Sequence, residues 1–284
     1  MTTATTYTEI RYEVDGPVLL ITLDRPERLN AIGENMISEL RHAVATAERD
    51  PAITGIVLTG AGRGFCAGAD MDGLKDLAAD ENADPFTRSG AQPDLQPGGP
   101  DHSPHFDKSV TFLMAVRKPV IGAINGPAAG MGLSVAAACD IRIAAQDAFF
   151  VNAFAQRGLS GEHATTWLLP RLMGHGRALD MMWTGRRVGA DEALAVGLVN
   201  QIVPKDQLVE TAKDYVRTLA TTASPRSLMH IKQQTYLDLM RSLGDAMDDG
   251  EDRIRESLSW TDFAEGVAAF QERRPPNFPD LTLT

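Results

Sequence analysis

The sequence predicts an α/β protein that continues into a helical region, and three observations favour this fold class. Short runs rich in Val and Ile lie at 18–23, 53–59, 119–125 and 140–145, with Gly, Pro or Asp at their ends, as buried strands usually have. Helical patterns separate these runs, which indicates crossover connections between largely parallel strands. From about residue 205 onward, the apolar residues follow the helical period alone.

The individual elements follow in chain order. After the first strand, a helix is expected over 30–50, because Met36 and Leu40 have helical spacing and Pro51 provides a stop. A second helical pattern covers 131–138, between the third and fourth predicted strands.

The segment 79–108 breaks this alternation. It is polar, rich in Pro and Gly, and has neither the helical nor the strand period. We expect a long mobile surface loop, which could be a lid over a site or an insertion without a role.

The C-terminal part is predicted to be helical throughout. Apolar stripes that include Ile231 and Leu239 need a partner surface, as in a cap or an oligomer contact. We therefore divide the chain into a core at 1–204 and a helical region at 205–284. The expected helices cover 206–220, 225–248, 251–258 and 262–272.

Composition excludes several classes of protein. With 284 residues, a net charge of −11 and no apolar run long enough to cross a bilayer, we expect neither nucleic-acid nor membrane binding. The first residues lack the features of a secretory signal, so a cytoplasmic location is expected. Cys66 and Cys139 are interpreted as small buried hydrophobic residues. The motifs of P-loop, dinucleotide and metal sites are missing, so no metal or separate cofactor is expected.

Two glycine-rich stretches each follow a predicted strand. Residues 60–71 read GAGRGFCAGADM, and 125–134 read NGPAAGMGLS at the start of a predicted helix. Small residues leave the backbone accessible to a ligand, and a helix start offers N–H groups to negative charge. Either stretch alone could be only a tight turn.

Together these stretches resemble the enoyl-CoA hydratase/isomerase, or crotonase, superfamily. The resemblance rests on RGFCAGADM followed by KPVIGAINGPAAGMG, and it covers nearly the whole chain. LDRPERLNAI, TGRRVGADEALAVGLVNQIVP and DFAEGVAAFQERRPPNF are also similar to that family, in the same order. The resemblance implies a spiral of ββα units, with C-terminal helices that assemble trimers or pairs of trimers.

The resemblance also implies an oxyanion hole made of two backbone N–H groups. The matching positions are Ala69 and Met131. Most members have glycine at the second position. Methionine offers the same main-chain N–H as a donor. Such donors stabilise the negative charge that develops on a thioester oxygen, each by roughly 3 kcal/mol.

Further positions match contacts to coenzyme A, which enters as part of the substrate. Those in the N-terminal part are Arg28, Leu29, Ala67, Gly68, Asp70 and Met71. Arg273 matches a basic residue that reaches the CoA phosphates, in some members from a neighbouring subunit.

The catalytic acids depart from the hydratase pattern. Hydratases of the family use two glutamates, and the matching positions here are Ser134 and Phe154. Ser134 could bond a substrate or only pack in its helix, while Phe154 is expected to wall the acyl pocket. Glu162 falls where dienoyl-CoA isomerases and chlorobenzoyl-CoA dehalogenases carry a catalytic aspartate.

Glu162 has two interpretations. It could be a single acid/base that moves a proton or activates a water, or it could only favour the dipole of a helix led by Ser160. His163 follows it, but adjacent residues of a helix do not face each other, so His163 is expected to be a surface or loop residue.

The resemblance thus implies chemistry on acyl-CoA thioesters through an enolate. A single carboxyl group favours double-bond isomerisation or single-base hydration. The alternatives are an acyl-CoA-binding protein without turnover and a hydrolase of a thioester or carbon–carbon bond.

Overall fold

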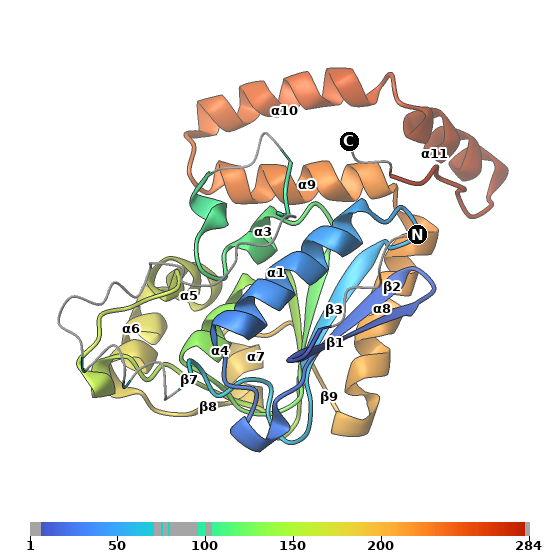
Figure 1. Cartoon of the computed structure of the whole chain (residues 1–284). Coiled ribbons are helices and arrows are strands. Elements are labelled where there is room, and N and C mark those ends of the chain that lie inside the picture. The colour runs from blue at the N-terminus through green and yellow to red at the C-terminus, as the bar shows by residue number, and fades with distance from the viewer. Residues whose placement is uncertain (1–6, 71–74, 76–78, 80–95, 100–103, 282–284) are drawn as a thin grey trace.

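The computed structural model describes residues 7–70, 75, 79, 96–99 and 104–281 (Figure 1). The larger part of the predicted loop at 79–108 therefore lies outside the described residues, and its last part, Pro104–Asp107, forms a short 3-10 helix, η2.

Nine strands are present in the described part of the chain. They are β1 (Ile10–Asp15), β2 (Val18–Leu23), β3 (Gly55–Gly60), β4 (Val120–Ile124), β5 (Ala128–Ala129), β6 (Ile141–Ala145), β7 (Phe149–Val151), β8 (Val188–Gly189) and β9 (Gln201–Val203).

The helices alternate with these strands as far as β9, and after β9 the described chain forms helices without further strands. The α-helices are α1 (Glu34–Arg49), α3 (Phe112–Ala115), α4 (Met131–Ala138), α5 (Thr165–Met173), α6 (His175–Thr184), α7 (Ala190–Ala195), α8 (Leu208–Thr222), α9 (Pro225–Asp238), α10 (Leu243–Ser257) and α11 (Thr261–Glu272). Further 3-10 helices are η1 (Pro26–Arg28), η3 (Ala155–Arg157) and η4 (Lys205–Gln207).

The main sheet has the strand order β1-β2-β3-β4-β6-β9. Only the β1–β2 hairpin is antiparallel, and the other pairs are parallel. Every residue of β3 is buried, as expected for a central strand covered on both faces. A small sheet, β5-β7-β8, lies beside the main one. The predicted α/β class with largely parallel pairing is confirmed.

Helices α1 and α8 cover the main sheet (Figure 1). α1 packs on β1 and β2, and α8 packs on β2, β3, β4 and β6. Leu208, Ala212 and Val216 of α8 are fully buried there. Removing a side chain as large as those of Leu208 and Val216 from water contributes about 1.5–3 kcal/mol each.

The predicted start of the first helix is wrong by four residues. Leu29 and Asn30 have left-handed backbone angles, with φ of 52° and 57°, so the helix begins only at Glu34. The side chain of Asn30 is buried and bonds the loop after β3 instead.

The C-terminal part is helical, as predicted, but its divisions differ. The helix expected over 225–248 ends at Asp238, and a new helix, α10, begins at Leu243. Ser242 causes this restart, because its hydroxyl accepts a hydrogen bond from the N–H of Asp245. α10 then runs through the break expected near residue 250.

Cys66 and Cys139 are free and buried, as interpreted from the sequence. Burial raises the pKa of each thiol to about 12. Among the residues that the structure describes, no helix is both long and apolar enough to cross a membrane.

Candidate active site

The two glycine-rich stretches leave the carboxyl ends of β3 and β4 and meet. Cys66 and Ala128 form a parallel bridge, and the N–H of Ala129 donates to the carbonyl of Cys66 at 2.9 Å. The N–H groups of Phe65 and Cys66 both donate to the carbonyl of Pro127 at 3.1 Å. These bonds fix the loop after β3 against the start of α4.

Gly132 and Gly68 make this approach possible. A β-carbon built on Gly132 would lie 2.2 Å from the carbonyl oxygen of Cys66, which is far inside contact distance. Gly68 has a φ of +114°, which other residues rarely adopt. The glycines therefore bring the first turn of α4 directly onto the segment at 66–68.

The amides of Ala69 and Met131 lie on these adjoining segments. A β-carbon built on Gly68 would lie only 3.7 Å from the nitrogen of Met131. The N–H of Ile32 donates to the carbonyl of Gly68, and the carbonyl of Ile32 accepts from the N–H of Asp70. Because neighbouring residues of an extended backbone direct their N–H groups to opposite sides, the N–H of Ala69 points away from Ile32. Neither the Ala69 nor the Met131 amide donates a hydrogen bond to any described residue. Met131 is also the first residue of α4, where the helix dipole favours negative charge.

Two buried asparagines hold the loop that leads to Ala69. The side-chain amide of Asn30 donates to the carbonyls of Ala61, Gly64 and Phe65. From the other side, the amide of Asn125 donates to the carbonyls of Gly60, Gly62 and Gly64. A loop that lacks regular backbone pairing thus has its carbonyl groups satisfied by side chains. The sequence motifs did not point to a role for either residue, although Asn30 lies within LDRPERLNAI and Asn125 begins NGPAAGMGLS.

The predicted CoA contacts of the N-terminal part also come together. Arg28 forms an ion pair with Asp70 at 3.0 Å, and Arg25 forms another with the same carboxylate at 2.8 Å. The carbonyl of Leu29 accepts a hydrogen bond from the N–H of Ala67 at 2.9 Å. The side chain of Arg28 is exposed to solvent. Met71 lies outside the described residues.

Glu162 and His163 precede α5 and face each other. The helix begins at Thr165, so the interpretation that places Glu162 in a first helical turn is wrong. His163 Nε2 lies 3.2 Å from Glu162 Oε2, which also contradicts the expectation that these two side chains do not meet. The physical reason is the left-handed backbone of His163 and Ala164, with φ of 51° and 63°.

The surroundings of His163 are largely buried. Its side chain is 16% exposed, against 30% for Glu162. The ring of Phe154 lies 6.1 Å from the imidazole ring, measured between centroids. Nδ1 of His163 is 2.5 Å from the hydroxyl oxygen of Ser109. Burial lowers the pKa of His163 below its ordinary value, and the charge of Glu162 partly offsets this.

Ser134 is fully buried in α4. Its hydroxyl donates to the carbonyl of Gly130 one turn earlier, at 3.2 Å. This bond favours the packing interpretation over contact with a substrate.

Arg273 is not brought to the other site residues within one chain. It ends α11 and is exposed, and α11 lies at the other end of the molecule from α4 and α5 (Figure 1). A role in CoA binding therefore requires the site of another copy.

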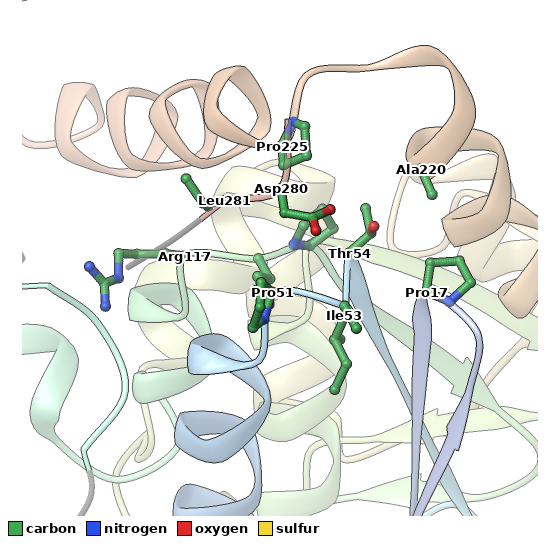
Figure 2. Close-up of a pocket in the computed structure, with 12 residues that line it drawn as sticks. Pro17, Pro51, Ile53, Thr54, Arg117, Ala220, Pro225, Asp280 and Leu281 are labelled. Carbon is green, nitrogen blue, oxygen red and sulfur yellow. The ribbon is translucent and has the colours of Figure 1, made fainter. Parts of the chain in front are cut away.

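A cavity of about 200 Å³ lies at the opposite end of the sheet (Figure 2). Its walls include Pro17, Thr54 and Pro119, which directly precede β2, β3 and β4. The two glycine-rich stretches leave the other ends of β3 and β4, so this cavity is separate from the candidate active site.

Comparison with known proteins identifies the class. The sequence profile described as Enoyl-CoA hydratase/isomerase matches residues 13–281. The chain belongs to this family, and its fold is the crotonase fold. It is an enzyme of the hydratase/isomerase type that acts on acyl-CoA substrates.

Individual relatives span nearly the whole chain. The 1,2-epoxyphenylacetyl-CoA isomerase of Escherichia coli K12 is 38% identical over 265 residues, covering 93% of this chain and 96% of the relative. The short-chain-enoyl-CoA hydratase of Clostridium acetobutylicum is 31% identical over 263 residues, covering 92% of this chain and 94% of the relative. The crystal structure of enoyl-CoA hydratase subunit I from Geobacillus kaustophilus HTA426 is 30% identical and matches with a TM-score of 0.83, over 97% of this chain and 99% of that one.

Proposed function

We propose that this enzyme moves a proton on an acyl-CoA thioester through an enolate, with Glu162 as its single acid/base. The Ala69 and Met131 amides hold the thioester oxygen. The Glu162 carboxylate removes a proton from the carbon beside the thioester and returns it to a more distant carbon. The product is a double-bond isomer. Single-base hydration, in which Glu162 activates a water molecule, uses the same groups.

The observation that carries this proposal is the pair of N–H groups on two adjoining segments, neither bonded to a described residue. Both residues are only half-buried, and a main-chain N–H without a protein partner is available to donate to a ligand. Donors fixed in place before the reaction stabilise charge that appears only at the enolate stage.

The side chains favour one acid/base over two. Ser134 and Phe154 occupy the positions of the two hydratase glutamates, and neither has a carboxyl group. Glu162 is half-buried beside His163, whose ring in turn lies near Phe154. The relative at 38% identity bears the name of an isomerase, and an isomerisation, like the proposed double-bond shift, adds no atoms to the substrate.

Coenzyme A would enter along the rim formed by Arg28, Leu29, Ala67, Gly68 and Asp70. Met71 continues this path in the sequence. The exposed guanidinium of Arg28 would attract the CoA phosphates, because arginine binds phosphate well through paired hydrogen bonds. Arg273 would serve the site of a neighbouring copy, so we also propose that the chain assembles as a trimer, or as a hexamer of two trimers.

The test uses vinylacetyl-CoA, crotonyl-CoA and an aryl thioester, phenylacetyl-CoA. We expect the wild type to convert vinylacetyl-CoA to its conjugated isomer with unchanged mass, or to add one water to crotonyl-CoA. Glu162→Gln should lower kcat by about 100-fold or more, because it removes the proton carrier, while CoA affinity is retained. Mass spectrometry and NMR of the products measure both.

Other outcomes identify the alternatives. Binding of all three thioesters without turnover would establish a non-catalytic acyl-CoA-binding protein. Release of free CoA and acid would establish a hydrolase. Full activity of Glu162→Gln would exclude the assigned acid/base.

A further inference from the structure

Three side chains form a hydrogen-bonded chain that includes Glu162, the proposed acid/base. Ser109, between η2 and α3, lies 2.5 Å from His163 Nδ1 through its hydroxyl oxygen. His163 Nε2 lies 3.2 Å from Glu162 Oε2. Ser109 is 54 residues away from His163 in the sequence, so the fold has to bring the two together.

The protons of this chain can be assigned from its chemistry. Burial favours the neutral imidazole of His163, which has one N–H and one acceptor nitrogen. An ionised Glu162 only accepts hydrogen bonds, so Nε2 carries the proton and donates it to Oε2. Nδ1 is then the acceptor and receives the hydroxyl proton of Ser109. Each donor meets one acceptor.

The backbone at this cluster is strained. Six residues other than glycine have a positive φ in the described part of the chain, and three of them are Ser109, His163 and Ala164. Such angles cost free energy and persist where the surrounding contacts require them. Here they turn the side chains of two consecutive residues, Glu162 and His163, toward each other.

Few charges surround His163 within the described part of the chain. There, Glu162 is the charged group that raises its pKa against the effect of burial. Phe154 contributes an apolar face. On the other side, Arg41 donates to the carbonyls of Asp107 and Ser109, which holds the Ser109 segment in place.

We propose that His163 is a positioning residue that orients the Glu162 carboxylate, and that Ser109 fixes the tautomer of His163 for this task. This inference rests on the proposed role of Glu162 as acid/base. His163 itself transfers no proton to the substrate. A carboxylate held by Nε2–H has one oxygen occupied, which leaves the other free for the substrate.

The first test is independent of turnover. Nitrogen NMR of the full-length protein with labelled histidine distinguishes the two tautomers and the imidazolium. Near pH 7 we expect His163 to be neutral with its proton on Nε2, and Ser109→Ala to convert it to a mixture of tautomers. A proton on Nδ1 in the wild type, or an unchanged spectrum in Ser109→Ala, would overturn the inference.

The second test compares variants of matched length. His163→Met removes the donor and His163→Gln keeps one on a side chain of similar shape. With vinylacetyl-CoA we expect His163→Met to lower kcat by about 10- to 100-fold with KM nearly unchanged, since orientation and not binding is lost. His163→Gln should recover at least part of that loss. Ser109→Ala should lower kcat in the wild type but not in the His163→Met background.

Equal kcat values for the methionine variant and the wild type would refute the positioning role, as would additive effects of the serine and histidine changes. If His163→Met does not fold, Ser109→Ala alone decides, and an unchanged kcat refutes it. Glu162→Gln separates the two proposals. If Glu162→Gln is inactive and the histidine variants are fully active, only the present inference fails. If Glu162→Gln is fully active, the proposed acid/base role fails.

Discussion

The groups assigned to the thioester oxygen are main-chain amides, so the path of the backbone matters more than the side chains at 69 and 131. Gly68 and Gly132 set that path through a positive φ and a close approach to Cys66. Asn30 and Asn125 then hold the loop with six hydrogen bonds from two side-chain amides. A methionine at 131 is compatible with this design because only its N–H is used.

His163 makes the stability of the protein depend on pH. Burial lowers its folded-state pKa below the ordinary value of 6.5, so in the window below 6.5 the unfolded chain binds more protons. Stability is therefore complete above 6.5 and falls as the pH falls through the lowered pKa of the folded state. His163→Gln should show a smaller loss. Urea unfolding at several pH values between about 7.5 and 5 measures the difference.

His230 also has a pKa lowered mainly by burial, but it is present in both proteins and cancels in the comparison. Parallel pH profiles of the wild type and His163→Gln would contradict the assigned environment of His163.

At the scale of elements, α8 differs from the three helices that follow it. α8 buries its apolar face on the main sheet. Helices α9, α10 and α11 instead expose large apolar side chains, among them Ile231, Leu243, Met247, Ile254, Leu258 and Phe270. Figure 1 shows these helices as a layer at one end of the molecule. Exposed apolar side chains on these helices are what the proposed trimer or hexamer would cover.

We expect the wild type to have a solution mass of about three or six times the 30.6 kDa of one chain. Ile254→Asp combined with Phe270→Asp should yield monomers, since the two side chains are 63% and 86% exposed in one copy and would be buried between copies. Light scattering after size-exclusion chromatography measures the mass.

Trp183→Asp is the control, because Trp183 is 69% exposed but lies on α6, outside this layer. The monomer should also bind CoA more weakly if Arg273 serves a neighbouring site. An oligomer that survives the double substitution, or a wild type that is monomeric, would refute the assembly.

Sequence patterns predicted the elements whose burial follows a simple period. The strands at 18–23 and 140–145 and the helix at 131–138 agree with β2, β6 and α4. Short strands such as β5 and β8, with two residues each, carry no period and were missed. The break between α9 and α10 depends on a single cap at Ser242, which an apolar pattern does not report.

The site was predictable where a motif fixes it and not where distant residues meet. The segments around Ala69 and Met131 could be found because glycines mark them. The contact of Ser109 with His163 joins residues 54 positions apart, and no local pattern indicates it. The pairing of Glu162 with His163 was rejected because a helix was assumed there. The left-handed backbone at 163–164 invalidates that assumption.

At the scale of the whole molecule, the candidate active site and the exposed C-terminal helices lie apart. The two glycine-rich stretches leave the carboxyl ends of β3 and β4, and ligands of parallel sheets commonly bind at that end. The C-terminal helices lie away from α4 and α5 (Figure 1). Arg273, at the end of α11, is the group through which assembly would affect the site.

The most direct test is a crystal structure of the enzyme with a non-hydrolysable acyl-CoA analogue bound that keeps the carbonyl oxygen, such as a ketone with CH2 in place of the thioester sulfur. The carbonyl oxygen of the ligand should lie about 2.7–3.1 Å from the nitrogens of both Ala69 and Met131. The carboxyl group of Glu162 should face the carbon beside the carbonyl, from which the proton is removed. An oxygen held by other groups, or a Glu162 carboxylate turned toward solvent in the complex, would contradict the mechanism.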